Sequence, residues 1–476
     1  MHTFKQFIAG EWVGAAKSWE VINPATEDRV ETIPFGDARD CRSAIEAAVK
    51  AFPSWSRKTS YERSALLKRT ADLMRQRSEE YARFTVLESG KPFIQAKLEW
   101  DAAGDMFEWF AEEGKRAYGR TVPSRKPDKR MTVLLQPIGV VGVITAWNFP
   151  VWNPARSCAA ALAAGCTVVC RPSEFTPLTG MLLAQCLQDA GIPAGVFNLI
   201  SGDPDSMGQE MLDNPHLRKI SFTGSPRVGK ILMDGASRTM TRLSLELGGN
   251  APVLIFPDVD LKALAQSAVT TKFRNAGQVC VSPQRFLVSK EAESQFIDEV
   301  SKLTGELKVG SGLEKETQVG PLINAKQRNH IAELVDDARK GGCSIPVGGK
   351  VPNACPKGYF YEPTVLASVT PEQRIFSDEA FGPVMPVTSF HEVEEAVHLA
   401  NQTPYGLAAY VWTNNLRVAN LAAERLEFGI VGVNEWVAHA IEAPFTGWKQ
   451  SGVGSECGKE GLDEYLEKKL VSMGGY

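Results

Sequence analysis

The sequence predicts an α/β protein with two parallel-sheet domains in tandem and a short β-arm. From Pro137 onward, short apolar runs such as IGVVGVITAW, CTVVCRPS and KISFTG alternate with helical stretches such as ARSCAAALAAG and GKILMDGAS. Strands that alternate with helices are typical of a doubly wound parallel sheet. A second alternation begins near Ala251 with PVLIF and runs to about Trp448 through RFLVS and VNEW. Two α/β domains therefore fit the pattern better than one.

The length and composition agree with this fold class. The 476 residues of the chain are about three times the ~150 residues of a typical domain. Hydrophobic residues make up 43% and charged residues 23%, which is the composition of an ordinary globular protein. The net charge of -4 offers no positive surface to nucleic acid or to an anionic membrane, and we expect neither as a partner.

Two further segments complete the predicted organisation. Residues 38–118 carry apolar positions at helical spacing and predict successive amphipathic helices. The following stretch, TVPSRKPDKRMTVLLQPIG, predicts two extended segments joined by a charged, Pro-bearing turn. We expect the C-terminal GLDEYLEKKLVSMGG to pair with this arm across a subunit interface.

Cysteine and histidine usage argues against disulfides and metals. The nine Cys are an odd number without paired CxxC modules, which favours reduced thiols. The six His show no HxxxH or HExxH spacing, so we expect no metal site. The N-terminal MHTFKQFIAGEWVG lacks the continuous apolar core of a signal peptide, and the longer apolar runs are interrupted, so we expect a cytoplasmic protein.

Cys280 is the candidate nucleophile. It lies in FRNAGQVCVSPQRF among Asn, Gly, Gln, Ser and Pro residues, which are poor core material, although a free Cys more often packs as a small buried hydrophobe. A thiol on such a loop can be activated to the thiolate and attack a carbonyl carbon.

Two polar residues at strand ends are candidates for the remaining chemistry. Glu246, in LELGGNAP, follows an apolar run that is expected to raise the pKa of its carboxyl group toward that of a general base. The alternative is a buried Glu paired with a cation. Asn148, in ITAWNFP, follows a buried strand, where its amide can donate to an oxyanion or simply cap a turn.

A candidate phosphate-binding turn lies in SFTGSPRVGKI, where Gly224 and Ser225 present backbone amides at a helix N-terminus. This segment nearly matches a P-loop through Gly224, Gly229 and Lys230. Ile231, however, stands where Ser or Thr would hold magnesium. A P-loop-like nucleotide-binding protein is therefore the runner-up class.

Taken together, these motifs resemble the aldehyde dehydrogenase superfamily over essentially the whole chain. AWNFP, RPSE, FTGS, LELGGNAP, GQVC, DEAFGPV and KQSG occur in that family's order. The resemblance implies NAD(P)-dependent oxidation of an aldehyde to a carboxylic acid through a thiohemiacetal and a thioester on Cys280. It also implies that Glu246 activates water and that Asn148 holds the oxyanion. A non-catalytic structural protein of this fold is disfavoured, because all three residues are present.

The resemblance also implies how the chain divides and assembles. We expect a Rossmann-like cofactor-binding domain, a catalytic domain and an oligomerisation arm, with a homodimer or homotetramer as the assembly. The predicted ranges are 1–118 and 138–248 for the cofactor-binding domain, 249–448 for the catalytic domain, and 119–137 and 455–476 for the arm.

A set of cofactor-binding residues follows from the same resemblance: Trp147, Arg171, Ser173, Glu174, Gly224, Ser225, Glu379 and Phe381. A carboxylate at Glu174 favours the free 2′-hydroxyl of NAD. Arg171, where the family usually has Lys, can instead attract the 2′-phosphate of NADP. We expect NAD or NADP, with NAD favoured.

Two arginines indicate the substrate class. Arg156 and Arg274 align with residues that resemble the distal-carboxylate grip of succinate semialdehyde dehydrogenases, and two guanidiniums would form a fork for a carboxylate. We therefore expect a semialdehyde such as succinate semialdehyde or 2-oxoglutarate semialdehyde. Uncharged aliphatic or aromatic aldehydes are the alternative, since either Arg alone more commonly forms a structural salt bridge. Near the expected tunnel wall, Trp436, His439 and Trp448 are bulkier than the residues often found there.

Overall fold

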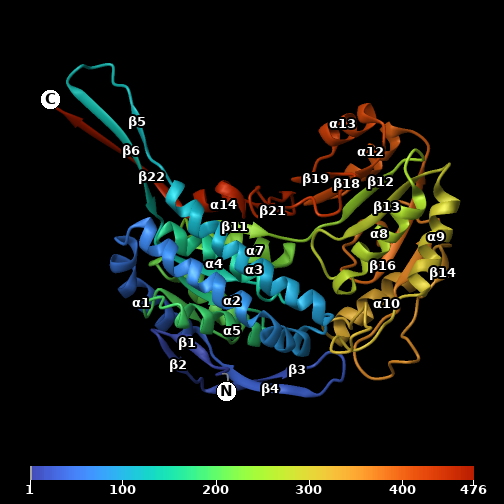
Figure 1. Ribbon diagram of the computed structural model, residues 1–476, viewed down its shortest axis with the longest axis horizontal. Coiled ribbons are helices and arrows are strands. Elements are labelled where there is room, and N and C mark those ends of the chain that lie inside the picture. Colours follow the sequence, from blue (N-terminus) through green and yellow to red (C-terminus); the bar gives the residue numbers. More distant parts are fainter. Residues whose placement is uncertain (1–2, 476) are drawn as a thin grey trace.

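Two open sheets organise the chain in the computed structural model, which describes residues 3–475 and is drawn in Figure 1. The centre of the first sheet is made of parallel strands in the spatial order β9 (Phe197–Leu199), β8 (Thr167–Arg171), β7 (Val140–Ile144), β10 (Leu217–Thr223) and β11 (Arg242–Glu246). Its antiparallel edges are β1 (Gln6–Ile8) with β2 (Glu11–Val13) on one side and β21 (Gly452–Val453) on the other.

Helices surround this sheet, and the central strands are buried as expected for a parallel sheet covered on both faces. They are α1 (Ala38–Ser56), α2 (Ser60–Ser89), α3 (Phe93–Glu113), α4 (Trp152–Ala164), α5 (Pro177–Asp189), α6 (Pro204–Asp213) and α7 (Pro226–Ala236). The first three confirm the helices predicted for residues 38–118.

Local sequence sets the bounds of these helices, as α2 illustrates. The Thr59 side chain accepts a hydrogen bond from the Glu62 N–H at 3.2 Å, and the Glu62 carboxylate accepts one from the Thr59 N–H at 2.8 Å. This reciprocal capping box satisfies backbone donors that the first turn leaves free. The helix ends at Ser89 and is capped by Gly90, whose φ of +76° is a conformation that glycine adopts readily.

The second sheet has the order β14 (Ser344–Val347), β15 (Thr364–Ala367), β16 (Val384–Phe390), β13 (Pro283–Ser289), β12 (Ala251–Ile255), β18 (Ala408–Trp412) and β19 (Ile430–Val433). All of its neighbouring pairs are parallel except β14 with β15. Its helices are α8 (Leu261–Phe273), α9 (Glu293–Gly305), α10 (Ala325–Lys340), α11 (Arg374–Ser377), α12 (Val393–Asn401) and α13 (Leu416–Arg425). The strand predicted at VNEW lies earlier, in β19, because Asn434 takes a φ of +54° and turns the chain away.

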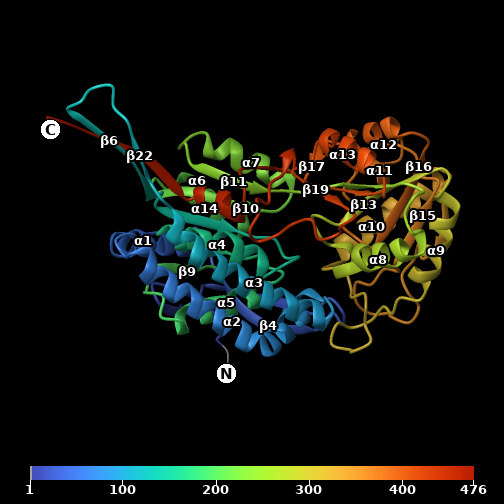
Figure 2. The same cartoon turned by 45° about the horizontal axis from the view of Figure 1, so that its top comes forward.

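The arm is a three-stranded sheet of β5 (Arg120–Val122), β6 (Lys129–Pro137) and β22 (Leu466–Gly474), and both ribbon views show it projecting from the body (Figures 1 and 2). The predicted pairing of the C-terminal strand with the arm is confirmed, but the expectation that it crosses a subunit interface is wrong. β22 pairs with β6 of its own chain along its whole length, and the Ile138 N–H continues this pairing at the base of the arm by donating to the Tyr465 carbonyl at 3.0 Å.

The smaller elements are the hairpin of β3 (Lys17–Ile22) and β4 (Arg29–Phe35), the pair β17 (Tyr405–Gly406) and β20 (Trp448–Lys449), and helix α14 (Gly458–Asp463). None of the helices in residues 3–475 combines the length and apolar character that crossing a bilayer requires.

The strand order of the first sheet predicts a binding crevice between β7 and β10. From β7 the chain proceeds to β8 and β9 on one side and to β10 and β11 on the other. Such a switch in direction opens a crevice at the carboxyl ends of the strands. The chain passes from the first sheet to the second between Glu246, the last residue of β11, and Ala251, the first residue of β12. The carboxyl edge of the first sheet therefore faces the second lobe. The residue limits given above for the cofactor-binding domain, the catalytic domain and the arm remain predictions.

Candidate active site

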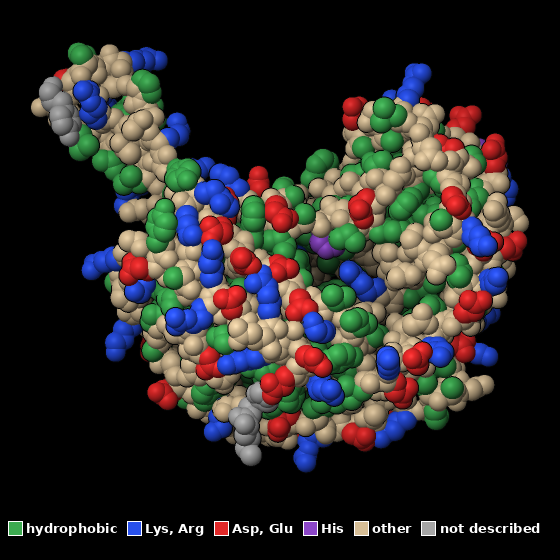
Figure 3. Space-filling model, viewed as in Figure 1, with side chains coloured by type: hydrophobic (Ala, Val, Ile, Leu, Met, Phe, Trp, Pro, Cys, Tyr) green, Lys and Arg blue, Asp and Glu red, His purple; other side chains and the backbone are tan. Residues whose placement is uncertain are grey.

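A cavity of about 330 Å³ lies where α3 and α4 of the first lobe meet the loop before β13. Its wall includes Arg156, Arg274, Cys280 and His439, and the molecular surface is hollowed between the two lobes (Figure 3). The structure therefore brings the predicted nucleophile and both predicted substrate arginines to one cavity. Asn148 and Glu246 do not line this cavity, and both side chains are buried.

The loop that presents Cys280 begins with a run of left-handed residues. Asn275, Ala276 and Gly277 have φ values of +50°, +53° and +74°, and such backbone costs about 1–3 kcal/mol for each non-glycine residue. A Cβ on Gly277 would lie 2.1 Å from the Gly382 carbonyl oxygen, so no other residue fits there. The chain can therefore turn sharply after α8 and leave the thiol half-buried at the cavity.

Burial controls the protonation of the nucleophile. It raises the pKa of the Cys280 thiol to about 11, the positive charge of Arg156 acts to lower it, and the charges of Glu246 and Glu379 raise it further. The thiol is therefore neutral at pH 7, and it needs a base before it can attack.

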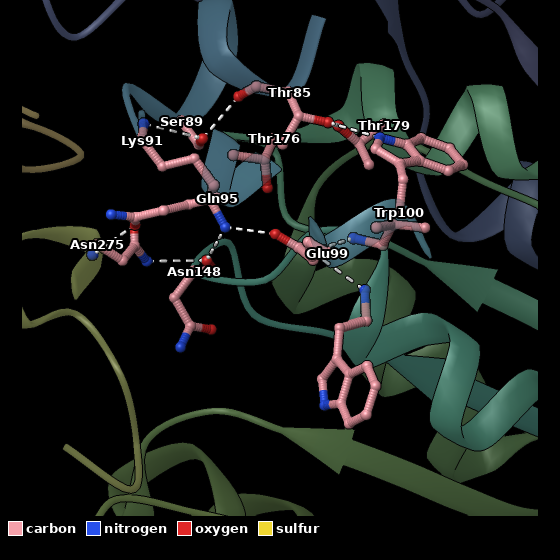
Figure 4. A network of polar contacts seen from close by, with 12 residues as sticks. Thr85, Ser89, Lys91, Gln95, Glu99, Trp100, Asn148, Thr176, Thr179 and Asn275 are labelled. Atoms are coloured by element: carbon pink, nitrogen blue, oxygen red, sulfur yellow. Dashed lines mark hydrogen bonds and ion pairs between the residues drawn. The ribbon is translucent and has the colours of Figure 1, made fainter. Parts of the chain in front are cut away.

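Asn148 is held by a network of hydrogen bonds that joins the two lobes (Figure 4). Its side-chain Nδ2 donates to the Gln278 carbonyl at 3.2 Å, two residues before Cys280. Its own carbonyl accepts from Lys91 Nζ at 2.8 Å and from Asn275 Nδ2 at 3.0 Å. One amide N–H of Asn148 is thus fixed against the nucleophile loop.

A buried ion pair supports this network. Lys91 and Glu99 are each about 1–2% exposed and lie in contact at 2.5 Å. The second carboxylate oxygen of Glu99 accepts from the N–H groups of Val151 and Trp152, at the start of α4. Lys91 Nζ also lies 4.3 Å from the centre of the Phe149 ring. Sequence reasoning missed this pair, because neither residue stands in a recognisable motif.

Glu246 ends β11 as a buried carboxylate. Burial, and then the charge of Glu456, raise the pKa of Glu246 well above its ordinary value, while Arg156 acts to lower it. Its Oε2 atom has no hydrogen-bond partner among the described residues. The apolar run before it predicted this direction of the pKa shift, and a raised pKa makes the carboxylate a stronger base.

Arg156 forms a buried ion pair that the sequence did not reveal. Its Nε lies 2.8 Å from Oε2 of Glu456, and both side chains are 2–3% exposed. The other oxygen of Glu456 accepts from the hydroxyls of Ser157 and Ser221 at 2.8 and 3.2 Å. Arg156 therefore does form a structural pair, yet its guanidinium also reaches the cavity, 4.7 Å from the ring centre of Phe445.

Arg274 lacks such a partner. Within residues 3–475 it makes no ion pair and no hydrogen bond, and its guanidinium lies 5.7 Å from the ring centre of Phe149. Burial lowers the pKa of Arg274, which remains a cation at neutral pH. The cavity wall therefore carries one guanidinium whose charge no carboxylate balances.

Of the three bulky residues expected at the tunnel wall, only one is there. His439 lines the cavity. Trp436 instead packs beside Trp412 at 4.8 Å between ring centres and donates to Ser267, and Trp448 lies half exposed on β20.

The predicted cofactor residues lie mostly around the crevice of the first sheet. Trp147 and Phe381 meet edge to face at 5.5 Å between ring centres. Oε1 of Glu379 accepts from the Gly249 N–H at 2.9 Å, while its Oε2 has no hydrogen bond to a described residue. Burial raises the pKa of Glu379 to about 7. Its free oxygen can accept a hydrogen bond from a ligand hydroxyl.

Three of these residues have local partners. Arg171 forms an ion pair with Glu174 at 2.9 Å and donates to the Gly202 carbonyl, so the two side chains neutralise each other rather than compete for a ligand. The Ser173 hydroxyl accepts from the Phe175 N–H at 3.3 Å.

The expectation that Gly224 offers a free amide is wrong. Its N–H donates to the Glu246 carbonyl at 3.0 Å, because β10 and β11 continue their pairing there. Ser225 is the N-cap of α7, and its side chain accepts from the Val228 N–H at 3.4 Å.

The arrangement has the parts of an acyl-transfer site. A thiol can add to a carbonyl carbon, an amide N–H can donate to the oxygen that becomes negative, and a carboxylate of raised pKa can activate water. Residues 3–475 contain no group of three or more His, Cys, Asp and Glu side chains placed to hold a metal ion.

Comparison with known proteins gives consistent matches over the chain. A model of the aldehyde dehydrogenase family matches residues 12–471. Mitochondrial succinate-semialdehyde dehydrogenase of Oryza sativa subsp. japonica is 43% identical, covering 98% of this chain and 89% of that protein. Glutarate-semialdehyde dehydrogenase of Pseudomonas aeruginosa is 41% identical, covering 98% and 97%. The crystal structure of succinate-semialdehyde dehydrogenase from Burkholderia pseudomallei matches with a TM-score of 0.97 at 42% identity, covering 100% and 98%.

The raised pKa of Cys280 predicts how its alkylation depends on pH. In the free protein, the rate of modification by iodoacetamide should rise about tenfold per pH unit from pH 7 toward pH 10, because the thiolate fraction grows until the pH reaches the pKa of about 11. Mass spectrometry of the peptide that contains Cys280 separates it from the other half-buried thiol, Cys355. A rate that is already constant above pH 8 would contradict the burial argument.

Proposed function

This chain belongs to the aldehyde dehydrogenase family of NAD(P)-dependent oxidoreductases, and from that premise we propose that its substrate is a semialdehyde with a distal carboxylate, such as succinate semialdehyde or 2-oxoglutarate semialdehyde. The observation that carries the proposal is the unbalanced guanidinium of Arg274 on the cavity that also exposes the Cys280 thiol. Arg156 adds a second guanidinium to the same wall. The names of the relatives support the class, since both name semialdehydes derived from dicarboxylic acids.

The first proposed step forms a carbon–sulfur bond at Cys280. The thiol gives its proton to a base, for which the carboxylate of Glu246 is suited by its raised pKa. The thiolate then adds to the aldehyde carbon, and the carbonyl oxygen becomes an alkoxide. Asn148 donates one amide N–H to Gln278 and keeps its second N–H for this oxygen, with the backbone N–H of Cys280 as the other donor.

The residues around the crevice fit a dinucleotide cofactor. The free oxygen of Glu379 suits a ribose hydroxyl, and Trp147 and Phe381 form an aromatic wall beside it. Because Arg171 is neutralised by Glu174, little positive charge remains for a 2′-phosphate, which supports NAD over NADP. When bound, the cofactor accepts the hydride that converts the thiohemiacetal to the thioester.

The last proposed step releases the acid. Glu246 first passes the proton it took from Cys280 to solvent and then takes a proton from water. The hydroxide attacks the thioester carbon, and the carbon–sulfur bond breaks to give the carboxylate product and the neutral Cys280 thiol. A buried carboxylate whose Oε2 atom has no protein partner is suited to this role, because that oxygen is free to accept a hydrogen bond from water.

Glu246→Gln tests the second half of this mechanism. The variant should form about one reduced cofactor per site in a burst, provided that Cys280 can still be deprotonated, and then turn over about a hundredfold or more slowly, because the thioester lacks its base. Stopped-flow absorbance at the reduced-cofactor band measures both phases. Unchanged steady-state turnover would remove Glu246 from the mechanism.

Arg274→Met tests the substrate class. The variant should lose about 10- to 100-fold in kcat/KM for succinate semialdehyde, the effect of one hydrogen bond to a charged group, and little for hexanal. Arg125→Met, an exposed arginine on the turn of the arm, is the matched control. Equal losses for both aldehydes would reject carboxylate binding and favour the alternative of uncharged aldehydes.

We also propose that the chain forms a homodimer or homotetramer through the arm. β22 is an edge strand of nine residues, and unpaired edges of this length are usually covered. Leu134 and Leu470 on the same arm are 39% and 62% exposed.

Leu470→Lys should disturb such an assembly, because it places a charge on the apolar surface of the edge strand. Light scattering after size exclusion should give a lower mass for the variant than for the wild type at the same concentration. A monomeric wild-type protein would contradict the assembly itself.

A further inference from the structure

His439 is a half-buried histidine on the cavity wall that the mechanism does not use. It follows β19 in the second lobe and lines the cavity together with Arg156 from α4 and Arg274 from the end of α8. Its ring meets Phe445 edge to face at 6.0 Å between centres. The imidazole makes no hydrogen bond with any residue that the structure describes.

The charged and titratable groups that share this wall are Lys91, Glu99, Arg156, Arg274 and Cys280. Lys91 is balanced by Glu99, and Arg156 by Glu456. The Cys280 thiol is neutral at pH 7. Arg274 is then the one unbalanced charge among these groups, so the wall suits an anion.

Burial and the two arginines together keep the imidazole neutral. Burial, and then the charges of Arg274 and Arg156, lower the pKa of His439 to about 4. The ring is therefore neutral at pH 7, where it carries one N–H donor. A neutral donor adds a hydrogen bond for an anion without adding a further positive charge to a wall that already holds Lys91, Arg156 and Arg274.

We propose that His439 is a specificity-determining residue that donates a hydrogen bond to the distal carboxylate of the substrate, beside Arg156 and Arg274. This assignment rests on the proposed function. The carboxylate has several acceptor sites, which two guanidiniums and one imidazole can share. An aldehyde that ends in a methyl group would leave the imidazole N–H without a partner.

Paired variants test this role with two aldehydes of the same chain length, succinate semialdehyde and butanal. His439→Ala should raise KM for succinate semialdehyde about tenfold, the effect of one hydrogen bond to a charged group, and change kcat/KM for butanal less than about twofold. His439→Asn keeps an N–H donor and should restore most of the lost affinity. His216→Ala, on the exposed surface, is the control, and a thermal melt of each variant checks folding.

The outcomes separate this inference from the proposed function. If the wild type prefers succinate semialdehyde but His439→Ala affects both aldehydes equally or neither, the role of His439 is wrong and the substrate class stands. If Asn fails to restore what Ala loses, a hydrogen bond is not the cause. If the wild type shows no preference for succinate semialdehyde over butanal, the proposed substrate class fails first, and this assignment fails with it.

Discussion

The main-chain carbonyl of Asn148 is the point on which the candidate site depends. It accepts hydrogen bonds from Lys91 of the first lobe and from Asn275 of the second. Asn275 also begins the left-handed turn that leads to Cys280, and the Asn148 amide bonds the same loop at Gln278. One peptide group thus fixes the amide donor and the nucleophile relative to each other. Catalytic groups need such fixed positions, because small displacements cost large factors in rate.

The electrostatics of the cavity follow from how its buried charges are paired. An ion taken out of water without a partner costs several kcal/mol, so buried charges are usually paired. Lys91 with Glu99 and Arg156 with Glu456 obey this rule. Arg274 has no carboxylate partner among the described residues, and it lies on the cavity wall where a substrate would bind. A bound carboxylate would supply the missing counter-charge, which gives a physical reason for selecting an anionic aldehyde over a neutral one.

Much of the fold could be predicted from the sequence, because strand and helix periods alternate regularly along the chain. The site was only partly predictable. Cys280 could be predicted because it stands in a polar segment that is unsuited to a buried core. Glu456 could not, because it lies in GVGSECG, within a range that was predicted to belong to the arm. Its pairing with Arg156 spans 300 residues of sequence, and no local pattern reports such a contact. For the same reason, the sequence could not show that the Gly224 N–H is hydrogen-bonded to the Glu246 carbonyl, since this bond depends on how far β10 and β11 continue to pair.

The central claim is that this cavity selects aldehydes that carry a distal carboxylate. The most direct measurement is the rate of reduced-cofactor formation by the wild-type protein, with NAD and NADP in parallel, on succinate semialdehyde, 2-oxoglutarate semialdehyde, hexanal and benzaldehyde. A kcat/KM preference of about a hundredfold, or about 2.7 kcal/mol, for the carboxylated aldehydes is the predicted result. Equal or better turnover of hexanal or benzaldehyde would keep the oxidation of aldehydes and contradict the account of the cavity.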